Sequence, residues 1–137
     1  MLLIAASLAA TAGAVAACGS EGISPTLDTE QHQAAVLFDQ RCSGCHTLTV
    51  AGTQGSATDV RTREYKDGPN FDQRKVSVNC AMYAIRNGGF SSGPMPQDIV
   101  VGPDAELLAQ FLAEESGSQV HLAPGATQPP DCPPPNG

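Results

Sequence analysis

A compact group of two thiols and one imidazole is the part of this chain best suited to chemistry. It reads Cys42-Ser43-Gly44-Cys45-His46. Thiols at this spacing can form a redox pair, contribute to a zinc site, close a disulfide or, with the histidine directly after them, attach a haem covalently. Each of these four uses requires different residues elsewhere in the chain. The surrounding sequence can therefore distinguish between them.

The surrounding sequence favours haem attachment. A thioredoxin-like pair needs a βαβ background, and this chain has no such pattern. A zinc site needs two more ligands, but Cys80 and Cys132 lie 35 and 87 residues beyond Cys45, unlike any compact finger spacing. A disulfide between Cys42 and Cys45 would close a small strained ring. Two thiols at this spacing instead suit the two vinyl groups of a porphyrin, with the imidazole of His46 directed at the iron.

Three stretches carry helix signals, and none shows the period of two that marks a strand. Asp28 followed by Gln31 predicts a capping box at the start of the first helix. Pro103 suits the first position of the third helix, with acidic residues in its first turn. The expected helices run over 28–42, 77–87 and 103–117. The composition of residues 47–75 predicts one long loop. Compact domains rarely contain a loop of this length unless the loop has a function.

The two later helices each have an apolar face. In the second, this face is expected to hold Val78, Ala81, Met82 and Ile85. Cys80 then falls on the opposite side, where its sulfur should be reachable from solvent. The third helix carries a tight apolar stripe, and Phe38 and Phe111 are expected to form the contact between the first and third helices. The stripe consists of Leu107, Leu108, Phe111 and Leu112.

The composition narrows the function classes. The 137 residues carry 14 acidic and 7 basic side chains, a formal net charge of -7, which argues against nucleic-acid binding. With 14 Gly, 11 Pro, 4 Phe, 2 Tyr and no Trp, much of the chain is loop and the core is short of large side chains. A prosthetic group, a disulfide or a partner is therefore expected to complete it.

The N-terminal sequence predicts export and lipid attachment. Residues 1–17 are uncharged and mostly apolar or small, which is typical of the apolar region of a secretory signal rather than a membrane span. Val15-Ala16-Ala17-Cys18 resembles the lipobox of bacterial lipoproteins, in which the cysteine receives the lipid. The alternative is ordinary signal cleavage that leaves a free Cys18. Residues 18–27 then form a short tether, and the Pro-rich residues 118–137 form an extended tail.

Over roughly residues 28–117 the chain resembles a class I monohaem cytochrome c. The resemblance implies an all-α fold with three or four short helices wrapped around one covalent haem, and with long loops. Ala34 departs from the Gly that this family often has at its helix crossing, and the tail has no family counterpart. The segments that carry the resemblance are, in chain order, Ala34-x-x-Leu37-Phe38-x-x-x-Cys42-x-x-Cys45-His46, Gly68-Pro69-Asn70-Phe71, Gly93-Pro94-Met95-Pro96 and the stripe from Leu107 to Leu112.

The resemblance also implies a role for each matching residue. Cys42 and Cys45 would hold one haem c (heme c) covalently, with His46 as the proximal iron ligand. The Pro69 carbonyl would accept the hydrogen bond of the imidazole, although Pro69 is otherwise an ordinary turn residue. Met95 would be the distal ligand. Its rivals are Met82, which suits the core, and His32 and His121, which suit the polar side of the first helix and the tail.

These roles imply one-electron transfer rather than catalysis. The expected protein is an extracytoplasmic electron carrier, or a subunit of a redox complex, lipid-anchored on the periplasmic side or the outer face of a bacterial membrane. Its partners would be redox proteins with a basic docking patch, because the chain is acidic. The alternatives are a haem sensor or peroxidase-like enzyme in which Met95 leaves the iron, and a structural lipoprotein without redox function.

Cysteine usage predicts one disulfide. After lipid attachment at Cys18 and haem attachment at Cys42 and Cys45, Cys80 and Cys132 remain. Spare thiols in an exported protein usually pair, because the compartment is oxidising. A bond between these two would strap the tail across the second helix. The alternative is a buried Cys80 and an unpaired Cys132.

Overall fold

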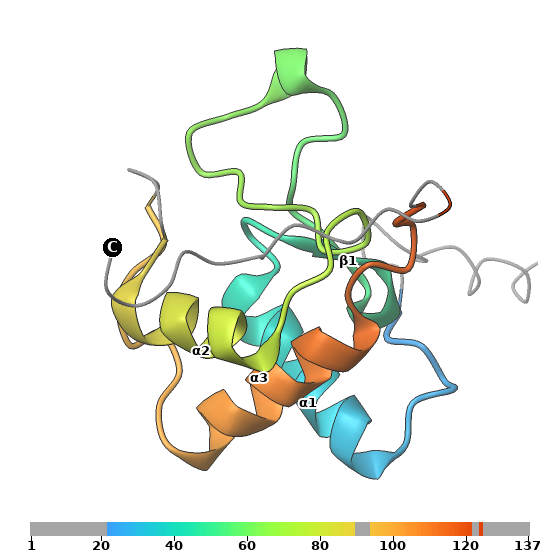
Figure 1. Ribbon diagram of the computed structural model, residues 1–137, viewed down its shortest axis with the longest axis vertical. Helices are drawn as coiled ribbons and strands as arrows, with labels where there is room; N and C mark the ends of the chain where they lie inside the picture. Colours follow the sequence, from blue (N-terminus) through green and yellow to red (C-terminus); the bar gives the residue numbers. More distant parts are fainter. Residues whose placement is uncertain (1–21, 90–93, 122–123, 125–137) are drawn as a thin grey trace, which may run out of the picture.

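The computed structural model of the chain describes residues 22–89, 94–121 and 124. This part is mostly helical, as expected, with three α-helices and one small sheet (Figure 1). The helices are α1 (Thr29–Cys42), α2 (Val78–Asn87) and α3 (Pro103–Glu115). The strands are β1 (Thr47–Leu48) and β2 (Thr53–Gln54), and the short 3-10 turns are η1 (Thr49–Ala51) and η2 (Val60–Thr62).

The helices start where local sequence signals place them, although α3 ends at Glu115, two residues before its expected end. The Asp28 side chain accepts a hydrogen bond from the backbone N–H of Gln31 (2.9 Å), and the Gln31 side chain accepts one from the backbone N–H of Asp28, which confirms the capping box. Ser77 caps α2 through a bond from the N–H of Cys80. Pro103 opens α3 at its first turn, as expected. Each helix therefore begins within one residue of its predicted start.

The expectation of no strand within residues 47–75 is wrong. β1 and β2 form an antiparallel hairpin in which Thr47 is paired with Gln54 and Leu48 with Thr53. A strand of two residues cannot display a period of two, so the pattern was too short to detect. The rest of the region is irregular, and residues 57–66, with η2 at their tip, stand away from the three helices (Figure 1).

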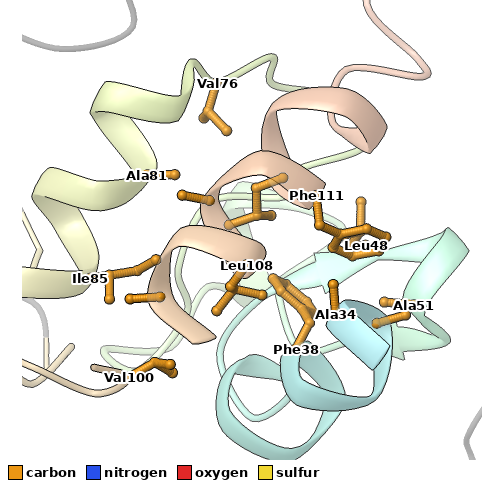
Figure 2. Close-up of a cluster of buried hydrophobic side chains, with 14 residues drawn as sticks. Ala34, Phe38, Leu48, Ala51, Val76, Ala81, Ile85, Val100, Leu108 and Phe111 are labelled. Carbon is orange, nitrogen blue, oxygen red and sulfur yellow. The ribbon is translucent and has the colours of Figure 1, made fainter. Parts of the chain in front are cut away.

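The core lies where α3 packs against α1 and α2. Its largest fully buried side chains are Phe38, Phe111, Leu48 and Leu108. In Figure 2, Ala34, Phe38 and Leu108 lie together between α1 and α3. Ala34 is fully buried, as its expected place at the helix crossing requires. With so few large side chains, the apolar core is small for a chain of this length.

The expected orientation of α2 is partly wrong. Ala81 and Ile85 are buried as expected, but Val78 is 40% exposed and Cys80 only 3% exposed. α2 packs on α3 and also forms a wall of a cavity, which Cys80 lines, so the apolar pattern of this helix does not by itself decide which of its side chains are buried. Cys80 is disulfide-bonded. Its expected partner Cys132 lies outside the described residues, so the pairing stays a prediction.

The proposed targeting and tail segments fall largely outside the description. Cys18 and residues 1–17 lie beyond it, as do residues 125–137 of the tail. Within the described ranges, no helix combines the length and the apolar character that crossing a membrane requires.

Candidate functional site

One cavity of about 1120 Å³ brings the predicted site residues together. It lies between the end of α1, residues 56–71, α2 and the segment that contains Met95. Cys42, Cys45, His46, Pro69 and Met95 all line it. Much of the remaining wall is apolar and comes from all three helices and the loop, including Phe38, Phe71, Ala81, Ile85, Leu108 and Leu112. The tertiary structure thus collects at one place residues that the sequence separates widely.

The backbone of the Cys42–His46 segment is held in a tight turn. The N–H groups of Cys45 (3.1 Å) and His46 (3.0 Å) both donate to the carbonyl of Cys42, which continues α1 by one turn. Gly55 donates its N–H to the carbonyl of His46, and Gly68 donates its N–H to that of Cys45. A Cβ on Gly55 would lie 2.7 Å from the Cys45 nitrogen. Only glycine therefore fits beside this turn.

The His46 imidazole is fixed in one tautomer. Its Nδ1 lies 3.0 Å from the Pro69 carbonyl oxygen, the contact expected from the sequence. A carbonyl only accepts, so Nδ1 carries the proton and donates it. Burial lowers the pKa of His46, and the bond to Pro69 only partly opposes this effect. The ring is therefore neutral near pH 7, with the lone pair of Nε2 available to a metal.

Aromatic rings support the imidazole, and this support was not expected from the sequence. Phe71 stacks on His46 with ring centroids 4.8 Å apart and planes inclined by 15°. Phe38 meets Phe71 edge-on at 6.0 Å. The only sequence signal for this role is the apolar side chain that follows Gly68-Pro69-Asn70 directly. Stacking together with the Pro69 bond restricts both the tilt and the rotation of the imidazole.

The loop that carries Phe71 is tied to the chain on two sides. The N–H of Phe71 donates to the carbonyl of Thr47 in β1 (2.8 Å), and its carbonyl accepts from the N–H of Gly117 beyond α3 (2.7 Å). The next residue, Asp72, accepts from the backbone N–H and the hydroxyl of Thr49, and its carbonyl accepts from the N–H of Gln119. The hairpin and the residues after α3 therefore position the loop behind His46.

The two thiols are free, and the surroundings of the first one disfavour its ionised form. Cys42 and Cys45 are unpaired and half-buried. Burial, with a smaller contribution from Cys45, raises the pKa of Cys42 to about 12. A thioredoxin-like pair works through a thiol of lowered pKa, so this environment disfavours that use. In the described part of the chain, no three His, Cys, Asp or Glu side chains form a group that could hold a metal ion.

Met95 reaches the cavity through a close backbone approach. Its side chain is half-buried, and the N–H of Asp98 donates to the Arg86 carbonyl in α2 (3.3 Å), which ties the segment to that helix. A Cβ on Gly88 would lie 2.7 Å from the Met95 carbonyl oxygen, and Gly88 has a φ of +79°. Gly88 therefore both ends α2 and admits the Met95 backbone.

The rival ligands lie elsewhere. Met82 packs against the core, and His32 and His121 are exposed. None of the three lines the cavity. Among the described histidines and methionines, only His46 and Met95 line the cavity.

No protein-family model matches this chain, and neither does any curated protein. The residues themselves must therefore carry the functional argument.

Proposed function

We propose that this chain is a class I monohaem cytochrome c that transfers single electrons. One haem would be attached through Cys42 and Cys45, with His46 and Met95 as the iron ligands. The observation that carries the proposal is the shared cavity: an imidazole with an available Nε2, a thioether and two unpaired thiols line it together. The three groups near α1 come from one turn, whereas Met95 comes from the segment after α2.

The residues fit a large apolar cofactor. Cavities that take drug-sized ligands measure about 300–1,000 Å³, and this cavity measures about 1120 Å³. Without an occupant, the apolar side chains of its walls would be exposed to water. This exposure would lower the stability of a chain with so small an apolar core. The fit therefore also explains how a sequence with few large side chains completes its interior.

The chain's own residues would hold and insulate the redox centre. When bound, the haem supplies an iron that alternates between its ferrous and ferric forms. The Pro69 carbonyl keeps the Nε2 lone pair of His46 directed into the cavity. As a ligand, the Met95 thioether would favour the ferrous form and so raise the reduction potential. Phe38 and Leu108 keep water from the wall between α1 and α3. If His46 and Met95 both bound the iron, no site would remain for a substrate, and the residues would support outer-sphere electron transfer.

The location of the carrier is part of the same proposal. Cys18 would be lipidated after removal of residues 1–17, and residues 18–27 would tether the domain to a bacterial membrane on its extracytoplasmic side. Haem attachment to C-x-x-C-H takes place in that compartment. A freely diffusing tethered carrier and a subunit of a larger redox complex are both compatible with this anchor.

Haem incorporation tests the proposal directly. The full chain is expressed with a cytochrome c maturation system, and the purified protein is analysed by denaturing mass spectrometry and by its pyridine haemochrome spectrum. We expect one covalent haem per chain, and none in the double variant Cys42→Ala/Cys45→Ala. The matched control Ser43→Ala changes the same turn without removing a thiol and should keep the haem. The absence of covalent haem from the wild-type chain would refute the proposal.

The ferric spectrum separates the carrier from a sensor or peroxidase-like enzyme. Methionine ligation produces a weak near-red charge-transfer band, which an open or high-spin iron lacks. We expect this band, and we expect no binding of added carbon monoxide to the reduced protein at neutral pH. A missing band together with carbon monoxide binding would favour the alternative in which Met95 leaves the iron.

A further inference from the structure

Charge is distributed very unevenly over this acidic protein. Residues 41–75 contain six of the seven basic side chains and four carboxylates, a net charge of +2. The other described residues contain eight carboxylates and one basic side chain, Arg86, a net charge of -7. The formal charge of the whole chain therefore conceals a basic region, and this region includes much of the cavity wall.

Residues 57–66, hereafter the cavity loop, present this basic region to solvent. Val60 (83% exposed) and Tyr65 (75%) are the two most exposed large hydrophobic side chains among the described residues. Arg61 and Arg63 lie beside them and are also exposed. Figure 1 shows this loop standing clear of the three helices, so a partner could reach it from several directions.

The cavity loop carries three basic and two acidic side chains, a net charge of +1, and its ion pairs involve the lysine rather than the arginines. Lys66 forms ion pairs with Glu64 (3.4 Å) and Asp67 (2.7 Å). The carboxylate of Asp59 accepts the backbone N–H of Arg61. Among the described residues, neither arginine forms a side-chain ion pair.

The cavity loop is also part of the functional site. Val60, Arg63 and Tyr65 line the cavity, and all three are exposed. A partner that covers this loop would therefore sit against the wall of the proposed haem cavity. Short distance between redox centres is what a docking surface for electron exchange must provide.

We propose that the cavity loop is the docking surface for a redox protein whose own surface is acidic. This inference rests on the proposed function. An exposed aromatic and a valine flanked by arginines have the composition of a protein interface. The arginine charges would attract an acidic partner, although the net charge of -7 alone predicts a basic one. One electron would pass between the two redox centres, with no bond made and no proton moved. A loop of this size suits a small, transient interface.

The sign of a salt effect tests the proposal without knowledge of the partner. The reduced protein is oxidised by hexacyanoferrate(III), an anion that takes one electron and becomes hexacyanoferrate(II), and the rate is followed by stopped flow. Salt screens exposed charges, and local fields alter association rates by about 10- to 1,000-fold. If the cavity loop guides the anion, the rate falls as salt is added. If the net charge governs the approach, the rate rises, and the proposal is overturned.

A pair of charge-matched variants locates the effect. Arg61→Glu and Arg86→Glu change the net charge equally, and both side chains are exposed outside the proposed ligand set. We expect Arg61→Glu to slow the low-salt reaction by about threefold or more, within the range of electrostatic steering. Arg86→Glu should slow the low-salt reaction by a factor less than half of that found for Arg61→Glu. Equal slowing by both variants would contradict a local docking surface.

A second measurement does not depend on electron transfer. Hexacyanochromate(III) is a paramagnetic anion that broadens the NMR signals of residues near which it binds. We expect selective broadening of residues 60–66 in the full-length protein, and loss of this effect in Arg61→Glu. Broadening centred elsewhere, or none, would refute the docking surface. Failure of the proposed function would instead appear as a chain that lacks covalent haem, whatever the anion does.

Discussion

The substitution Gly68→Ala tests the packing of the imidazole most sharply. A Cβ at this position would lie 2.6 Å from Nδ1 and 2.7 Å from Nε2 of His46. Real Cβ atoms essentially never approach other heavy atoms this closely, so something must shift. The ring has little freedom to do so, because Pro69 holds its Nδ1 and Phe71 stacks on its face. Gly68 has no positive φ, so backbone strain does not confuse the result.

The size of the effect follows from this contact. Forcing a methyl group into a well-packed site costs about 1–3 kcal/mol, and loss of the His46–Pro69 hydrogen bond adds about 0.5–1.5 kcal/mol. A total near 2–4 kcal/mol lowers the Tm of a domain of about 100 residues by roughly 10 °C or more. In the haem-bound protein we also expect an altered reduction potential, because a shift of the imidazole ring changes the direction of the Nε2 lone pair.

Gly44→Ala is the matched control, since it lies within the same cysteine motif. A Cβ on Gly44 would meet nothing within 4 Å. Its effect on the free energy of unfolding should stay within about 0.5 kcal/mol. Thermal unfolding followed by far-ultraviolet circular dichroism compares the two variants, and a redox titration compares their potentials. Equal Tm values for Gly68→Ala and Gly44→Ala would refute the reasoning from the close approach of Gly68 to His46.

Three further predictions concern the anchor, the distal ligand and the disulfide. Cys18→Ser should release a soluble, still red protein from membranes; retention in the membrane fraction after a salt wash would contradict lipid attachment. Met95→His should keep the iron low-spin and lower its potential, because a second imidazole favours the ferric form more than a thioether does. An unchanged spectrum and potential in Met95→Ala would give the distal role to another residue. Non-reducing peptide mapping should yield a peptide that links Cys80 to Cys132, whereas two alkylatable thiols in the oxidised haem protein would exclude the bond.

Local sequence determined the elements that carry the site. The capping pair Asp28 and Gln31 and the proline at position 103 mark helix starts, because their hydrogen bonds and φ preferences act within one turn. Cys42, Cys45 and His46 lie within five consecutive residues. Their use in haem attachment could therefore be hypothesised without knowledge of the fold. Even the bond from His46 to Pro69 was expected, through the resemblance of two short segments.

Only the tertiary structure decided how these parts meet. Phe71 stacks on His46 because β1 and the residues after α3 hold its loop, and none of these contacts is local. Cys80 is buried and lines the cavity, whereas a helical pattern assigns it to the solvent side, because the pattern does not show which distant segments surround α2. The two-residue strands are specified by their pairing and not by a period. The net charge counts side chains but not their positions, so only the fold reveals that Arg61 and Arg63 stand exposed beside the cavity.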